Sequence, residues 1–104
     1  MKKALIVGID YYKSASRLYG CVNDAYAVKN ALERDGDGSI NFNVKLMVSS
    51  NAEDVIVADD LREGIRALFA DKNEIALFYL AGHGFVDDRG GFIHTGDQSI
   101  YSHK

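Results

Sequence analysis

The sequence predicts an α/β protein in which a mostly parallel sheet is covered by helices on both faces. Two observations predict this class. Residues 3–9, 43–48 and 75–80 are short, largely apolar runs typical of buried strands, and the segments between them repeat apolar residues at three- and four-residue spacing. Because crossovers between parallel strands are right-handed, we expect the strands to lie parallel in one sheet. In the common order 2-1-3 the first and third strands are neighbours.

The first strand and helix are predicted from the N-terminal third of the chain. Residues 3–9 carry an uninterrupted apolar run, as a strand buried on both faces does. A loop is expected from there to Cys21. Asn23 or Asp24 can cap a helix that extends to Arg34, where a turn rich in glycine and aspartate ends it.

The next strand, helix and strand are predicted from the same kinds of pattern. After the strand at 43–48, Ser50 and Glu53 have the spacing of a capping box, and the better-defined part of the next helix runs from about residue 61 to 70. The last strand, 75–80, is apolar throughout, so we expect it to be central in the sheet and covered by helices on both sides.

Composition limits the partners. The chain has 104 residues, which fits one domain, and its 12 Lys and Arg against 15 Asp and Glu give a net charge of −3. Binding to phosphate or to an anionic membrane needs a stripe of basic residues, and this sequence shows none. No nucleic-acid partner and no membrane partner is therefore expected. The single cysteine suits a reducing compartment, and the first apolar run is too short for a signal or membrane segment, so we expect a cytoplasmic location.

Chemistry is expected where the loops after the first and third strands meet, at the carboxyl edge of the sheet. His83 ends the last strand between Gly82 and Gly84. It can move protons near neutral pH, Gly82 allows a sharp turn, and the Gly84 N–H is open to stabilise an oxyanion. The alternative is a histidine that only caps the strand by bonding a carbonyl. Nearby tyrosines, Tyr12 among them, either line the crevice or cover the helix.

Cys21 is the only thiol of the chain and a candidate nucleophile. It precedes a predicted helix N-terminus, where partial positive charge lowers a thiol pKa, and it could serve a small thiol hydrolase together with His83. The alternative is a small packing residue.

Metal and nucleotide motifs are weak in this sequence. The three histidines lack metal-ligand spacing, and neither a P-loop nor a G-x-G-x-x-G motif occurs. Asp87, Asp88 and Asp97 could hold a hard cation such as calcium through oxygen ligands, or could form a solvated turn.

Three segments, ALIVGIDYY at 4–12, LYGCVNDA at 18–25 and FYLAGHG at 78–84, resemble in order and spacing the N-terminal half of a caspase-like domain. The nearest group is the metacaspases and bacterial caspase-like proteins of the C14 peptidase family. The resemblance implies a three-layer sandwich of caspase-hemoglobinase type, incomplete in this chain, with residues 1–104 as the N-terminal part of a single peptidase domain. It also implies a cysteine endopeptidase with a His–Cys dyad that acts on polypeptides.

By resemblance, His83 is the dyad histidine and the Gly84 amide is an oxyanion donor. The nucleophilic cysteine is expected downstream, so we expect this piece alone to be inactive, and Cys21 occupies a position that is usually structural in the family. Carboxylates near the catalytic loops can bind calcium in the family, which keeps the three aspartates named above as candidates; no other cofactor is expected. The segments GFI at 91–93 and TGD at 95–97 resemble the short strand and the aspartate that precede the nucleophile.

An alternative function is a non-catalytic caspase-like scaffold or regulator. The open apolar edge of an incomplete sheet is expected to pair with the missing C-terminal part of the domain or with another chain.

Overall fold

The computed structural model describes residues 2–13, 15–70, 72–88, 90–97 and 99–103, and of the strand residues 85–87 and 99–103 it describes the backbone. Strands and helices alternate through the first part of the chain, in the order β1 (Lys2–Ile9), α1 (Cys21–Glu33), β2 (Asn43–Ser49), α2 (Ala58–Ala70) and β3 (Ile75–Ala81). Three short strands follow, namely β4 (Gly84–Asp87), β5 (Gly90–His94) and β6 (Ser99–His103).

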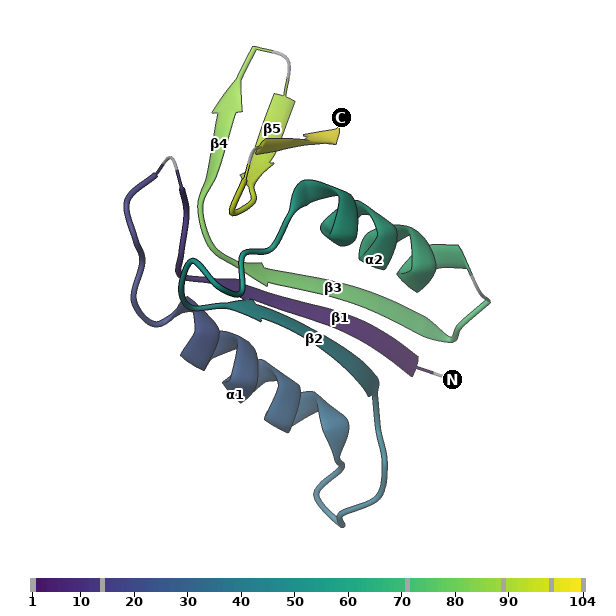
Figure 1. Cartoon of the computed structure of the whole chain (residues 1–104). Coiled ribbons are helices and arrows are strands. Elements are labelled where there is room, and N and C mark those ends of the chain that lie inside the picture. The colour runs from purple at the N-terminus through teal and green to yellow at the C-terminus, as the bar shows by residue number, and fades with distance from the viewer. Residues whose placement is uncertain (1, 14, 71, 89, 98, 104) are drawn as a thin grey trace.

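The first three strands form one parallel sheet, as the sequence predicted, and their order is the common β2-β1-β3. Leu5 in β1 lies opposite Lys45 in β2 and Phe78 in β3. Figure 1 shows α1 and α2 on opposite faces of this sheet. The three-layer α/β architecture is therefore confirmed. Within the described residues, no helix is long and apolar enough to cross a membrane.

Strand β1 is the centre of the molecule because both of its faces are covered. Its odd-numbered side chains, such as Leu5 and Val7, pack with Leu61 and Leu68 of α2. Its even-numbered side chains, such as Ile6, pack against α1 in a second cluster. Each aliphatic side chain fully removed from water contributes about 1.5–3 kcal/mol, so β1 holds both layers together.

The prediction that the third strand is central in the sheet is wrong. Strand β3 pairs only with β1 among the described strands and lies at the edge of the sheet, and its residues are half-buried where those of β1 are buried. Both strands are apolar runs, and apolarity alone does not distinguish a strand paired on two sides from one paired on one.

Helix α1 begins at Cys21, earlier than the predicted caps at Asn23 and Asp24. Gly20 is the N-cap residue, in the left-handed region with φ 106°, and it has no side-chain cap. The first N–H of the helix, that of Cys21, instead donates to Oδ1 of Asp10 at 2.9 Å. A carboxylate that follows β1 therefore stabilises the helix N-terminus from outside the local sequence.

The predicted capping box at residues 50–53 is also wrong. These residues form a turn in which the N–H of Ser50 donates to Oδ1 of Asp54 at 2.9 Å. Helix α2 begins later, at Ala58, whose N–H donates to Oδ1 of Asp97 at 3.0 Å. The β-branched residues 55–57 lie between the turn and the helix and belong to neither, since branched side chains are stiff in a helix.

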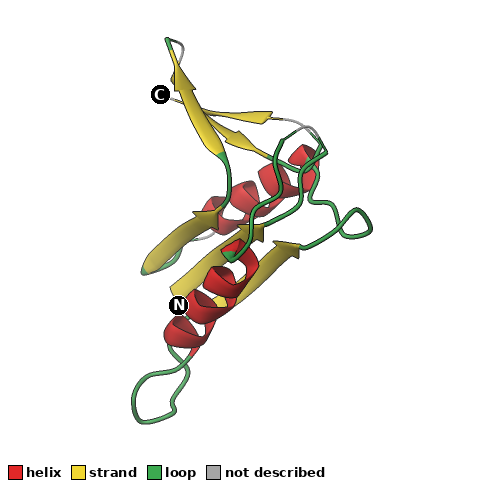
Figure 2. Ribbon diagram, turned by 90° about the vertical axis from the view of Figure 1, so that its left-hand side faces the viewer, coloured by secondary structure: helices red, strands yellow, loops and turns green. Residues whose placement is uncertain are grey.

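A second, antiparallel sheet in the order β4-β5-β6 stands beyond the carboxyl end of β3 (Figures 1 and 2). Gly84 pairs with Ile93, and Gly90, with φ 127°, follows the turn between β4 and β5. The sequence indicated only a turn near residue 88 and a short strand at 91–93. It is joined to the carboxyl end of β3 at His83, whose carbonyl accepts the N–H of His94 at 3.1 Å.

Gly8 provides a test of how closely α1 packs on β1. A Cβ at this position would lie 2.6 Å from the Cys21 carbonyl oxygen and 2.7 Å from the Cβ of Ala25. We predict that Gly8→Ala lowers the free energy of unfolding by about 1–3 kcal/mol, because helix and strand must separate. Urea denaturation measures this. Gly36→Ala is the matched control, since nothing lies within 4 Å of its Cβ position; an equal effect of both variants would contradict the prediction.

Candidate functional site

The loops after β1 and β3 meet at the carboxyl edge of the sheet, as predicted. His83 follows β3 directly, and its backbone N–H donates to the hydroxyl of Tyr12 at 2.7 Å. The loop after β1 is fixed at its base, because the N–H of Leu18 donates to the carbonyl of Asp10 at 2.8 Å. Two hydrogen bonds thus place the loop beside the histidine.

The imidazole of His83 is half-buried, and its orientation is set by a backbone carbonyl. Its Nε2 lies 2.8 Å from the carbonyl oxygen of Ser16. Because a carbonyl oxygen can only accept a hydrogen bond, Nε2 must carry the hydrogen, and in the neutral ring Nδ1 then has the lone pair. In the neutral ring, Nδ1 is therefore the nitrogen that can accept a hydrogen bond.

Aromatic rings surround the imidazole. The ring of Tyr12 lies 4.8 Å from that of His83, centroid to centroid, at an angle of 59°. His94, at the end of β5, lies 6.3 Å from His83 and 6.2 Å from Tyr12 in edge-to-face geometry. Tyr12 therefore packs on the histidine, whereas Tyr19 is 83% exposed beneath the guanidinium of Arg17.

The two glycines that flank His83 serve different purposes. Gly82 does not have a positive φ; glycine is needed there because a Cβ would lie 2.5 Å from the Tyr12 hydroxyl. Gly84 starts β4 opposite Ile93, and the hydrogen bond beside this pair runs from the N–H of His94 to the carbonyl of His83 at 3.1 Å. Gly84 thus occupies a non-hydrogen-bonded position, and its own N–H points away from β5.

Cys21 lies at the start of α1, half-buried, and faces Asp10 rather than His83. Burial raises the pKa of its thiol, and the negative charge of Asp10 and a hydrogen bond to that carboxylate raise it further. The prediction that the helix N-terminus lowers the pKa of the Cys21 thiol is therefore wrong. His83 bonds Tyr12 and Ser16, and no hydrogen bond joins it to Cys21 in the described part of the chain.

Of the three candidate calcium ligands, Asp97 and Asp88 have described side chains. Oδ1 of Asp97 accepts hydrogen bonds from the Ala58 N–H and, at 2.8 Å, from the hydroxyl of Thr95. Asp88 is exposed in the turn after β4, and the side chain of Asp87 lies outside the described residues. Across those that are described, no three His, Cys, Asp or Glu residues gather where they could hold a metal ion. The described residues do not fit a calcium site, so calcium stays a prediction of the sequence.

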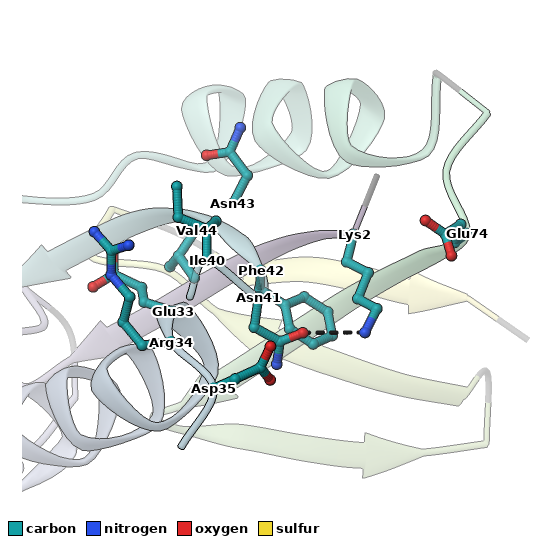
Figure 3. Close-up of a pocket in the computed structure, with 10 residues that line it drawn as sticks. All are labelled: Lys2, Glu33, Arg34, Asp35, Ile40, Asn41, Phe42, Asn43, Val44 and Glu74. Carbon is teal, nitrogen blue, oxygen red and sulfur yellow. Dashed lines mark hydrogen bonds between the residues drawn. The ribbon is translucent and has the colours of Figure 1, made fainter. Parts of the chain in front are cut away.

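A cavity lies at the opposite edge of the sheet, where the parallel strands begin. It measures about 690 Å³, and Lys2, Asn43 and Glu74 mark its position at the starts of β1, β2 and β3. Within it the Lys2 ammonium donates to Oδ1 of Asn41 at 3.1 Å (Figure 3). Since His83 follows the carboxyl end of β3, this cavity is separate from the candidate site.

Sequence reasoning did not find two of the groups that shape the site. The carbonyl of Ser16 belongs to the backbone, which every residue has, so no side-chain pattern could single it out. The carboxylate of Asp97 acts across 39 positions on the N-terminus of α2, and only the fold brings the two together.

An open parallel sheet between two helices, with a Gly-His-Gly segment at its carboxyl edge, is the arrangement that the resemblance to C14 peptidases implied. All of residues 1–104 match the family described as the Caspase domain of peptidase C14, and the chain belongs to this family. The chain is 35% identical to Metacaspase-1 of Meyerozyma guilliermondii over 105 residues, covering 96% of this chain and 26% of that protein.

Two further relatives agree. Metacaspase-1 of Schizosaccharomyces pombe is 28% identical over 105 residues, which are 96% of this chain and 25% of that protein. Metacaspase-1 of Cryptococcus neoformans var. neoformans serotype D is 34% identical over 86 residues, 80% of this chain and 19% of that protein. The chain spans about a quarter of the length of the first two relatives.

The environment of Cys21 gives a prediction about thiol reactivity. A raised pKa leaves less thiolate at a given pH, so alkylation by iodoacetamide should rise with pH through a higher apparent pKa in the folded chain than in urea. Asp10→Asn should lower that apparent pKa, because the amide has no charge. Asp24→Asn is the control, since the Asp24 charge is the weakest of the causes. Identical pH profiles for folded and unfolded chains would contradict this account.

Proposed function

We propose that this chain is the histidine-bearing part of a cysteine endopeptidase domain, in which His83 forms a dyad with a cysteine thiol contributed by further sequence. Membership of the caspase family supports a cysteine peptidase that acts on polypeptides. The observation that carries the proposal is the His83 imidazole at the carboxyl edge of the sheet, with Nε2 held on the Ser16 carbonyl.

The orientation of the ring defines the proton transfers. Nδ1 accepts the proton of the thiol, and the thiolate attacks the carbonyl carbon of the peptide, whose π electrons move to the oxygen. When the intermediate collapses, Nδ1–H donates its proton to the leaving amine and a thioester remains. Water then hydrolyses the thioester with His83 as general base. The Ser16 carbonyl stabilises the imidazolium, because the bond from Nε2–H strengthens when the ring is charged.

Gly84 supports the same reaction through its backbone. Its N–H points away from β5, and β4 is an edge strand of the described antiparallel sheet. An N–H directed at open space beside the histidine can donate to the oxygen of the tetrahedral intermediate. We assign this role to Gly84.

A second candidate function is a non-catalytic caspase-like scaffold. The observation that favours it is β3, an apolar strand that pairs only with β1 among the described strands. A free strand edge binds another strand through backbone hydrogen bonds. Cys21 carries no catalytic role in either proposal, since its thiol faces Asp10 and its pKa is raised by burial.

The role of His83 is tested in the full-length protein that contains this chain, with a library of fluorogenic peptides as substrates. We predict that His83→Gln lowers kcat/KM at least roughly 100-fold, because the proton acceptor is lost. The melting temperature should change little, since the imidazole is half-buried.

Cys21→Ala is the matched control and separates the alternatives. Retained hydrolysis in this variant agrees with a nucleophile elsewhere, whereas its loss in a folded protein would support a Cys21–His83 thiol hydrolase. Full activity of His83→Gln would overturn the proposal. Absence of cleavage by the unchanged protein would favour the scaffold.

A further inference from the structure

Tyr12 makes two separate contacts with His83, although 71 positions separate the two residues. Its hydroxyl accepts the backbone N–H of His83 at 2.7 Å, and its ring packs on the imidazole at 4.8 Å. The side chain of Tyr12 is only 5% exposed. One buried residue therefore restrains both the backbone and the ring of the histidine.

The backbone of His83 depends on Tyr12 because the neighbouring antiparallel sheet bonds its carbonyl but not its N–H. The His83 carbonyl accepts the N–H of His94 at 3.1 Å, whereas its own N–H is directed to the Tyr12 hydroxyl. Without the hydroxyl, a part-buried N–H would lose its partner at the residue that joins β3 to β4. Such a loss allows the backbone to shift.

Gly82 shows that room for the hydroxyl is built into the strand end. A Cβ at position 82 would lie 2.5 Å from the Tyr12 oxygen, and its next neighbours are atoms of Ile9 at 3.6 and 3.7 Å. The Tyr12 oxygen is thus the one close obstacle to a larger residue among the nearest atoms. Gly82 and Tyr12 are matched to each other.

We propose that Tyr12 is a positioning residue for His83: by holding the backbone N–H and packing on the ring, it keeps Nε2 on the Ser16 carbonyl and Nδ1 available as proton acceptor. The inference rests on the proposed role of His83 in peptide hydrolysis. Burial raises the pKa of Tyr12, so its hydroxyl stays neutral at physiological pH.

The first test is Tyr12→Phe in the full-length protein, which removes the oxygen and keeps the ring. We expect kcat to fall roughly 10- to 100-fold, as small misplacements of catalytic groups do. KM should stay within about twofold, because Tyr12 acts on the histidine and not on the substrate. Tyr26→Phe, on an exposed face of α1, is the matched control and should leave both constants unchanged.

A second test uses Gly82. When Tyr12 is present, Gly82→Ala should lower kcat, because the methyl group of the new alanine displaces the Tyr12 hydroxyl. In the Tyr12→Phe background the obstacle is gone, so the same substitution should cause little further loss. If the loss of kcat in the double variant equals the product of the losses in the two single variants, the proposed match between Gly82 and Tyr12 is contradicted.

A readout without activity separates this inference from the proposed function. The ¹⁵N signals of the His83 ring, assigned by their absence in His83→Gln, distinguish a protonated Nε2 from a mixture of tautomers. We expect protonated Nε2 in the unchanged protein and in Tyr26→Phe, and a mixture in Tyr12→Phe. If the tautomer shifts but no protein cleaves peptides, the proposed function fails and the positioning role stands. If Tyr12→Phe leaves both kcat and tautomer unchanged while His83→Gln is inactive, the inference is overturned.

Discussion

The burial of β1 is the constraint on which the rest of the structure depends. This strand pairs with β2 on one side and β3 on the other, and its two faces contact two different helices. Removing a side chain such as Ile6 or Val7 from water is worth about 1.5–3 kcal/mol, so the register of β1 is strongly fixed. That register brings the ends of β1 and β3 together, and with them the loop of Tyr12 and the histidine that follows β3.

Two carboxylates connect this framework to its loops. Asp10 accepts the first N–H of α1, and Asp97 accepts that of α2. Asp10 lies in the loop that joins β1 to α1, and Asp97 follows β5, 39 positions after Ala58. Each bond therefore joins a helix to the end of a strand as well as satisfying an N–H group. The same bonds determine what these residues can do: the charge of Asp10 disfavours a thiolate at Cys21, and Asp97 is engaged by the start of α2 and by Thr95.

The chemistry of His83 is set by neutral neighbours rather than by a carboxylate. In the described residues its ring nitrogen bonds a backbone carbonyl, and its backbone bonds a tyrosine hydroxyl. A carbonyl fixes which nitrogen carries the proton without adding a full negative charge. This arrangement agrees with the proton transfers that we propose for His83.

The sequence by itself determined the alternation of strands and helices, their parallel arrangement and the place of His83 at the end of β3, because these follow from hydrophobic period and from the handedness of crossovers. The order 2-1-3 was taken from the arrangement common to such sheets. Family membership was also readable from the segments around Gly8, Cys21 and His83. Only the tertiary structure decided that β3 pairs with β1 alone among the described strands and that Asp10 and Asp97 cap the helices. It also decided that Ser16 and Tyr12 orient the histidine. Most of these contacts join residues far apart in the chain. A local sequence pattern does not predict which group from another segment will accept or donate a given hydrogen bond.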